Sequence, residues 1–326
     1  MRCSGRRARR PRCPTRIYRK GNAGPGACPP GPASSMSRPH PLRSLASERA
    51  IPYWLILPTV VYVAVFFLVP VVQALLLAFR TQDGQWTTRF LWRMVQDIQF
   101  ASALRFTLLL LAIVVPLQLA TALLIALLVN TKFRGSRSFL YICAIPLGIS
   151  DLAAGLIWFS LFTQHGYINS FLYGLGLTER PIFFLSAQNV SWVVGSIVLA
   201  EHWRATAIVL VILVAGLQMI SRDYLEAAEV FGARPWQRLW HVTLPLLKPS
   251  LQSALIIRTI LALQMFAVVV ALGGRMVPVL AGEAYYWYYL YRNTNVASAY
   301  ALLLMVISAL LAWGYLRFLR PREVRS

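Results

Sequence analysis

Four charged residues interrupt otherwise apolar stretches of the sequence, and they are the side chains best placed for chemistry inside a fold. They are Asp151, Glu201, Arg204 and Arg258. A charge at membrane depth costs at least about 2.5 kcal/mol on insertion scales, so such groups face a cavity, a partner or one another. Two interpretations remain open. The charges contact a bound molecule, or they neutralise each other, as Glu201 and Arg204 can do from adjacent turns of one helix.

Recognisable sets of residues for metal binding or covalent catalysis are missing from the sequence. The cysteines form no CxxC pair, the histidines are far apart, and neither an HExxH motif nor a GxxxxGK[ST] phosphate loop occurs. We therefore expect no catalytic residues, no metal, no cofactor and no enzymatic activity. If the protein depends on ATP, another subunit must bind the nucleotide.

The composition is that of a membrane protein. Hydrophobic residues make up 58% of the chain and charged residues 13%, with a mean hydropathy of +0.59. A soluble domain carries roughly a quarter charged residues, so polar side chains cannot cover the surface of this one. Lipid must surround much of the fold.

Six apolar stretches are long enough to cross a bilayer, which predicts an all-α protein with six transmembrane helices. Each stretch exceeds the roughly 20 residues that one crossing needs. We expect Pro58 and Pro70 to kink the first helix. The predicted spans cover residues 51–79, 103–129, 138–162, 190–220, 250–272 and 296–318.

Composition divides the chain into four segments. Residues 1–50 are rich in Arg, Pro, Gly and Ser and almost free of acids, which predicts a disordered tail. Met36 is an alternative start of translation. Residues 51–100 are expected to form the first transmembrane helix and an outer loop, residues 101–319 the main transmembrane domain, and residues 320–326 a short C-terminus.

The distribution of basic residues predicts the topology. The net charge of +21 would suggest nucleic acid as the partner of a soluble protein. Here Lys and Arg gather in the N-terminal tail, in two alternate loops at 130–137 and 221–249, and at the C-terminus. Such residues accumulate in cytoplasmic loops. We therefore expect both termini and the long loop in the cytoplasm, and no nucleic acid partner.

The loop at 221–249 is long and has a structured pattern. Good helix formers run from Asp223 to Phe231, and Gly232 can end that helix. A second amphipathic stretch begins at Trp236 and is expected to close at Pro245 and Pro249. Two interpretations remain open. The helix anchors the loop at lipid headgroups, or small residues within it let another protein approach closely.

The same loop resembles the EAA loop of ABC importer permeases. The family pattern is Glu-Ala-Ala, then a Gly and, after a variable stretch, a Leu-Pro pair, placed on the cytoplasmic side between the fourth and fifth of six spans. The residues that match are Glu226, Ala227, Ala228, Gly232, Ala233, Leu244 and Pro245.

Other runs resemble the sugar-type permeases, of the maltose or glycerol-phosphate kind, in particular. These runs include Gly166 to Asn169, the pair Trp203 and Arg204, Ala215 to Gln218, and Phe266. Departures occur as well, because Phe231, Ala267 and Arg275 stand where the family usually has Asp, Asp and Pro.

The resemblance implies a type I ABC importer permease of the MetI-like fold in the bacterial inner membrane, with residues 101–319 as the permease domain. The partners implied are ABC ATPase subunits, a second permease subunit expected to be a different chain, an external solute-binding protein and membrane lipid. The helix at Glu226 would dock into the ATPase, where Ala227 and Ala228 allow close packing and Gly232 supplies the bend.

A carbohydrate is the expected solute, because sugars suit hydrogen bonds combined with aromatic faces. Trp203, Arg204, Gln264 and Phe266 are the candidates for the solute pathway. The alternatives are a permease for another solute, such as a polyol, glycerol phosphate, peptide or polyamine, or an ion-coupled secondary transporter. The latter would usually show repeated halves with broken helices.

Overall fold

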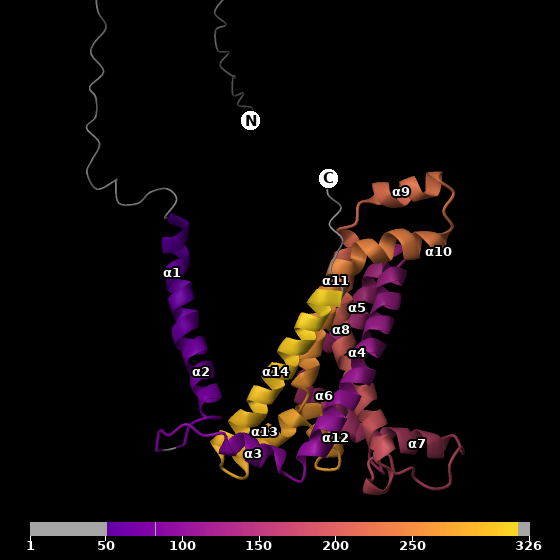
Figure 1. Cartoon of the computed structure of the whole chain (residues 1–326). Coiled ribbons are helices and arrows are strands. Elements are labelled where there is room, and N and C mark those ends of the chain that lie inside the picture. Colours follow the sequence, from indigo (N-terminus) through magenta and orange to yellow (C-terminus); the bar gives the residue numbers. More distant parts are fainter. Residues whose placement is uncertain (1–50, 82, 319–326) are drawn as a thin grey trace, which may run out of the picture. The chain divides into compact units, whose positions relative to one another are not determined.

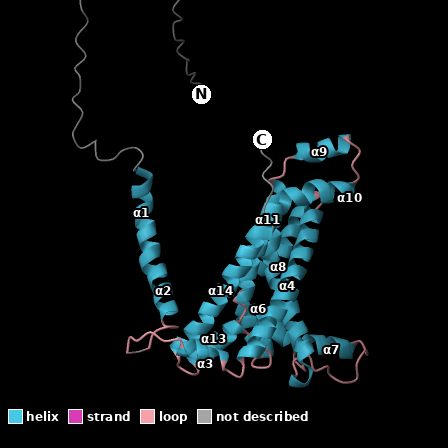
Figure 2. Cartoon of the chain, in the orientation of Figure 1, coloured by secondary structure: helices cyan, strands magenta, loops and turns pink. Residues whose placement is uncertain are grey.

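The computed structural model describes residues 51–81 and 83–318. The predicted tail at 1–50 and the C-terminus at 320–326 lie outside these residues. The regular elements of the described part are helices (Figure 2), and the predicted all-α membrane fold is confirmed. The chain forms two compact units that divide between Thr59 and Val60.

The N-terminal helices form one continuous run, in which no side chain from Tyr53 to Leu76 is buried. It consists of α1 (Ile51–Val63), the π-helix η2 (Ala64–Leu68) and α2 (Val69–Leu76). Pro70 lies directly after the π-helix inside this continuous run, and we attribute its accommodation there to the wider turn of the π-helix. The run is long and apolar enough to cross a membrane.

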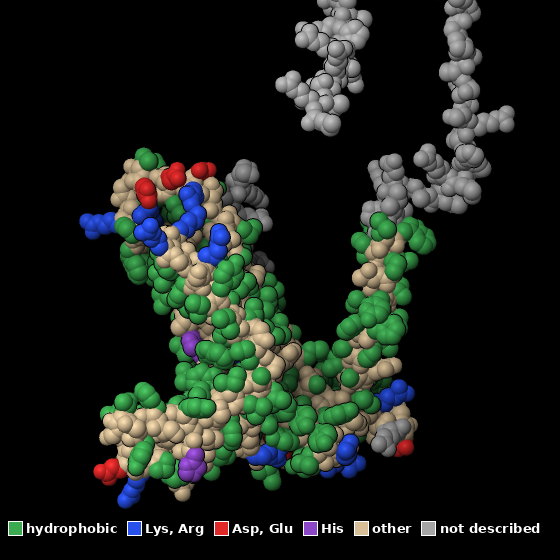
Figure 3. All heavy atoms as spheres, turned by 180° about the vertical axis from the view of Figure 1, so that it is seen from behind, with side chains coloured by type: hydrophobic (Ala, Val, Ile, Leu, Met, Phe, Trp, Pro, Cys, Tyr) green, Lys and Arg blue, Asp and Glu red, His purple; other side chains and the backbone are tan. Residues whose placement is uncertain are grey.

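The second unit is a helical bundle centred on α8 (Val190–Gln218). This helix packs against α4 (Phe100–Asn130), α11 (Leu244–Leu263) and α12 (Ala267–Gly273), and α11 also contacts α14 (Thr294–Phe318). Apolar residues lie on several sides of α8 and many of them are buried, as expected for a helix at the centre of a bundle. Hydrophobic side chains cover the bundle surface between its ends (Figure 3).

Shorter elements lie at the two ends of this bundle (Figure 1). At one end, α9 (Arg222–Val230) and α10 (Pro235–Arg238) connect α8 to α11. The opposite end carries α3 (Arg89–Val95), α7 (Tyr167–Gly174), η4 (Ala187–Asn189) and α13 (Leu280–Tyr289).

Among the described residues, five helices are long and apolar enough to cross a membrane, or six if one bent helix pair counts as a span. That pair replaces the third predicted span, 138–162. It consists of α5 (Ser136–Ala144) with η3 (Ile145–Gly148), followed by α6 (Asp151–Phe162) and α7, at an angle of 100°. Pro146 and the extended backbone of Ile149 and Ser150 interrupt the helix, and Ser150 then caps α6.

The boundaries around the fifth predicted span, 250–272, also need correction. The helix starts much earlier, because α10, the π-helix η5 (Leu239–Thr243) and α11 run without interruption from Pro235 to Leu263. Pro245 and Pro249 do not close the amphipathic stretch. Pro245 lies in the first turn of α11, directly after the π-helix, so its missing N–H interrupts little. The span then breaks at Gln264, before α12.

Candidate functional site

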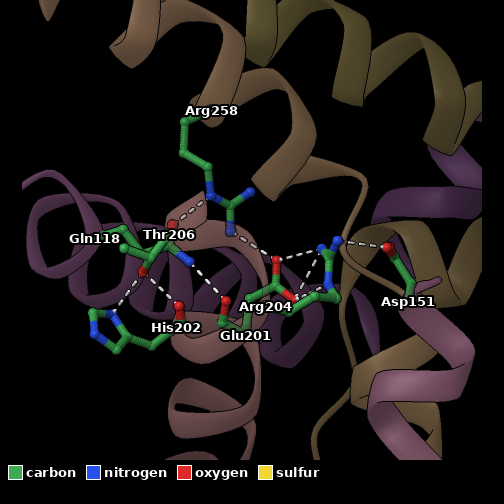
Figure 4. Close-up of polar contacts among 7 residues, drawn as sticks. All are labelled: Gln118, Asp151, Glu201, His202, Arg204, Thr206 and Arg258. Carbon is green, nitrogen blue, oxygen red and sulfur yellow. Dashed lines mark hydrogen bonds and ion pairs between the residues drawn. The ribbon is translucent and has the colours of Figure 1, made fainter. Parts of the chain in front are cut away.

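The four intramembrane charges meet in one cluster, with Glu201 of α8 at its centre (Figure 4). Arg258 of α11 donates from Nη2 to Glu201 Oε1 at 2.7 Å, and Arg204 donates from Nη2 to the same oxygen at 3.0 Å. Arg204 Nη1 also lies 2.9 Å from Asp151 Oδ1. The structure therefore brings together all four charges that the sequence singled out.

A neutral amide, which the sequence reasoning missed, completes the cluster. Gln118 of α4 is fully buried, donates from Nε2 to the backbone carbonyl of Glu201 at 2.8 Å, and accepts from Arg258 Nε through Oε1 (Figure 4). Its only signal in the sequence is an amide in a long apolar stretch. Through Gln118 the cluster ties α4 to both α8 and α11.

Burial divides the cluster into an inner and an outer part. Glu201 and Arg258 are each only 1% exposed, whereas the Arg204 side chain is 13% and the Asp151 side chain 47% exposed. Two arginines face two carboxylates, so the formal charges cancel. Buried charges of this kind are retained only with partners, and Asp151 forms the accessible edge.

The candidate pathway residues form two separate pairs. Trp203 lies between the cluster residues Glu201 and Arg204 in the sequence of α8, and contacts Trp158 edge-on, with ring centroids 6.0 Å apart. Gln264 is exposed at the break after α11, and the neighbouring Phe266 packs on Tyr285 at 4.7 Å. Within the described residues, no hydrogen bond, ion pair or aromatic contact joins Gln264 or Phe266 to Trp203 or Arg204.

The segment from Ser221 to Arg238 forms a helix, a glycine turn and a second helix. Ser221 Oγ accepts from Asp223 N at 3.3 Å and starts α9. At the other end Gly232 has a φ of +76°, while Gly232 N donates to Glu229 O and Ala233 N to Ala228 O. These two bonds define a Schellman motif, which needs a left-handed residue at the position of Gly232.

The surface of this segment is suited to contact with another protein. Glu226, Ala227 and Gly232 are exposed, and Phe231 is 89% exposed although it is aromatic. Figure 3 shows acidic side chains at its tip and Lys and Arg side chains beneath them. Glu229 forms an ion pair with Arg238, which joins α9 to α10.

The remaining matched residues lie around this helix. Ala228 and Ala233 are half-buried beside the glycine turn. Leu244 and Pro245 begin α11, where the helix enters the bundle. Helix α9 and its turn thus carry five of the matched residues, and α11 carries the last two.

A second polar cluster lies at the end of the bundle opposite α9. Asp97 accepts from Trp287 Nε1 at 2.7 Å and from the Tyr300 hydroxyl at 2.9 Å. Nearby, Glu283 of α13 is buried, and its Oε1 lies 3.5 Å from Arg275 Nη1. Burial raises the pKa of the Glu283 carboxyl above its ordinary value, Arg275 opposes this shift, and Asp97 adds to it.

Glu283→Gln is expected to make stability less dependent on pH. Because the folded pKa of Glu283 lies above its unfolded value, this carboxyl contributes stability that is full below the unfolded pKa and is lost as pH rises through the folded pKa. Thermal unfolding in detergent between about pH 4 and pH 7 should therefore show a smaller fall for the variant. The exposed Glu179→Gln is the control, and an equal fall in wild type and Glu283→Gln would contradict the prediction.

Comparison with known proteins identifies a family over most of the chain. The family model described as binding-protein-dependent transport system inner membrane component matches residues 118–323. A lactose transport system permease protein, LacF of Rhizobium radiobacter, is 32% identical over 219 residues, which cover 65% of this chain and 73% of that protein.

Two further relatives have similar coverage. A sulfoquinovosyl glycerol transport system permease protein, SmoG of Agrobacterium fabrum, is 34% identical and covers 67% of this chain and 71% of its own length. An sn-glycerol-3-phosphate transport system permease protein, UgpA of Yersinia pestis, is 30% identical, and the match covers 61% of this chain and 68% of that protein.

The fold is shared with a solved transporter. A chain of a bacterial ABC transporter that imports the acidic polysaccharide alginate superposes with a TM-score of 0.71 at 20% sequence identity, and covers 85% of this chain and 97% of that one. A second structure, of the alginate transporter with a periplasmic protein bound to alginate pentasaccharide, gives a TM-score of 0.69 at 22% identity.

Proposed function

Because the chain belongs to the family of binding-protein-dependent transport system inner membrane components, and is the permease subunit of an ABC importer, we propose that its solute is a carbohydrate. The subunit is a multi-pass, non-catalytic component of the inner membrane. An ATPase and a periplasmic binding protein are its partners. The permease function expected from the EAA loop is thereby confirmed, and the secondary-transporter alternative is set aside.

Charge balance in the intramembrane cluster supports a neutral sugar. Arg204 and Arg258 are both paired with carboxylates, so an anionic solute such as a glycerol phosphate would have to separate ion pairs to find a cation. A neutral solute can instead hydrogen bond to the accessible edge formed by Arg204 and Asp151. We place Trp203, Gln264 and Phe266 beside the same pathway, because aromatic faces and amides suit sugars.

Helix α9 is the proposed ATPase contact, with Glu226 as its polar group. The single observation that carries this assignment is the exposed, capped helix that ends in the Gly232 turn, at the sequence positions of the EAA pattern. Ala227 and Ala228 permit close approach, and the exposed Phe231 adds apolar contact area. Leu244 and Pro245 attach the segment to the bundle.

This assignment fixes the remaining topology. The α9 end must face the cytoplasm to reach an ATPase, and the basic residues near it support that side. Both termini would then be cytoplasmic. The second permease subunit is proposed to be a different chain, in keeping with the resemblance to sugar-type importers.

The experiment is co-purification of the ATPase with the membrane-extracted permease. Glu226→Lys reverses the charge on the docking face, and Gly232→Val forces a β-branched residue into the left-handed region. Both should reduce the recovered ATPase by at least about tenfold, as expected for a residue at the centre of an interface. Glu179→Lys makes the same charge reversal at the opposite end of the bundle and should leave recovery unchanged.

The readout must separate loss of docking from loss of folding. Each variant should elute from size-exclusion chromatography in detergent at the wild-type position, because the substituted residues are exposed and no heavy atom lies within 4 Å of a Cβ added at Gly232. Full ATPase recovery in both variants would contradict the proposal that α9 contacts the ATPase.

A further inference from the structure

A cavity of about 400 Å³ lies at the α9 end of the bundle, where three helices terminate. Helix α4 ends there at Asn130, α8 ends at Gln218, and α5 begins at Ser136. Residues of all three helices line it, together with the loop between α4 and α5. The cavity is separate from the ion-pair cluster and from the exposed face of α9.

The lining changes from polar to apolar with depth along each helix. Asn130, Ser136 and Gln218 stand at the helix ends. The apolar residues of the lining lie further into the bundle. Ala126, Leu140 and Val214 lie about one helical turn, or roughly 5 Å, beyond the polar residues at the helix ends, and Val129 and Leu217 directly adjoin those residues. The cavity is therefore amphipathic, with its polar rim at the α9 end of the bundle.

Two cations complete the polar rim, and the described residues that line the cavity include no acid. They are Lys132 and Arg137, both exposed, and neither forms an ion pair among residues 51–81 and 83–318. Lys132 has a left-handed backbone, with φ +54°, which is uncommon for a residue with a long side chain. This conformation turns the chain from α4 toward α5 at the cavity.

We propose that this cavity binds an anionic phospholipid, with its phosphate between Lys132 and Arg137 and the start of its acyl chains against the apolar wall. Basic pockets between transmembrane helices at the cytoplasmic surface recognise anionic headgroups. Free phosphate would satisfy the same two cations, but it would leave the apolar half of the cavity without a matching group. The continuous polar-to-apolar lining therefore favours the lipid.

The test is native mass spectrometry of the protein extracted in mild detergent, with its co-purifying subunits, after addition of phosphatidylglycerol or phosphatidylcholine. Wild type should retain phosphatidylglycerol in preference to phosphatidylcholine. Lys132→Gln combined with Arg137→Gln should lower retention of phosphatidylglycerol by at least about tenfold, because each cation near a membrane surface contributes measurably to anionic lipid binding. Both side chains are exposed, so the fold should survive.

The matched control removes two equivalent charges from the same end of the bundle. Arg134→Gln combined with Lys248→Gln changes exposed cations that do not line the cavity, and should retain the lipid as wild type does. An equal loss of phosphatidylglycerol in both double variants would show that retention depends only on net charge, and would contradict the proposed site. Displacement of the lipid by millimolar inorganic phosphate would assign the site to free phosphate instead.

This inference rests on the membrane location of the permease and on the proposed cytoplasmic orientation of its α9 end, but not on its solute. The lipid readout is obtained without transport. The two proposals are therefore tested separately. The α9 variants should lose the ATPase and keep the lipid, whereas the variant of Lys132 and Arg137 should lose the lipid and keep the ATPase.

Discussion

Glu201→Leu is expected to destabilise the protein by about 3–5 kcal/mol, the cost typical of removing one partner from a buried ion pair. Arg258 is 1% exposed and would lose its carboxylate, while Gln118 can offer it only a neutral oxygen. Arg204 would keep Asp151. The measurement is the thermal unfolding midpoint in detergent, together with the fraction of protein that remains monodisperse.

The double variant Glu201→Leu with Arg258→Met separates an unpaired charge from lost packing. Replacing both members of a buried pair by apolar side chains of similar volume is often neutral or stabilising. We therefore expect most of the lost stability to return. If the double variant is no more stable than Glu201→Leu alone, the damage does not come from the uncompensated charge of Arg258, and the account of the cluster is wrong.

Gly216→Ala is expected to weaken the contact between α8 and α11 by about 1–3 kcal/mol, as overpacking does in other cores. A Cβ at this position would lie 2.5 Å from the Cβ of Ser250 and 3.0 Å from Cδ1 of Leu247. The Ser250 Cβ is fixed to the backbone of α11, so the helices themselves must separate. Thermal unfolding in detergent should show the loss.

Two further variants test this explanation. Gly195→Ala lies on the same helix, but nothing approaches within 4 Å of the added Cβ, so it should not destabilise and gains helix propensity. Ser250→Gly, combined with Gly216→Ala, should restore part of the stability by removing the clashing carbon. A destabilisation that Ser250→Gly leaves unchanged would place the strain elsewhere.

Features with local causes were predictable from the sequence. The turn after α9 depends on one glycine and on hydrogen bonds between residues a few positions apart, so Gly232 marked the helix end correctly. The apolar stretches likewise indicated the long helices α4, α8 and α14, because length and composition decide whether a helix can cross a bilayer.

Features that depend on packing were harder to predict. Gln118 accepts a hydrogen bond from Arg258 across a sequence separation of 140 residues, and no local sequence pattern predicts such a contact. The charges of the cluster were recognisable by type, but their partners depend on how α4, α6, α8 and α11 are arranged. The two interpretations of the charges could not be separated without the fold.

The break in the third predicted span had visible but ambiguous signals. Pro146 and Ser150 can interrupt a helix, yet proline is tolerated in transmembrane helices such as α4, which continues through Pro116. Pro245 led to the opposite error, because it was expected to close a helical stretch that in the structure continues through it. A proline in a first turn begins a helix as readily as it ends one, and the π-helix before it let the chain continue.

The helical run from Pro235 to Leu263 connects the α9 end of the bundle to its interior. Figure 1 shows that this run bends where it enters the bundle, so that α10 lies across the end of the bundle and α11 runs down into it. Its outer end is joined to α9 by the ion pair between Glu229 and Arg238, and its inner part carries Arg258. A displacement of α9 would therefore be transmitted through α10 and η5 to α11, and a shift of Arg258 away from α8 would separate its guanidinium from Glu201. Movement at one end of the bundle would thus change the ion pairing in its interior.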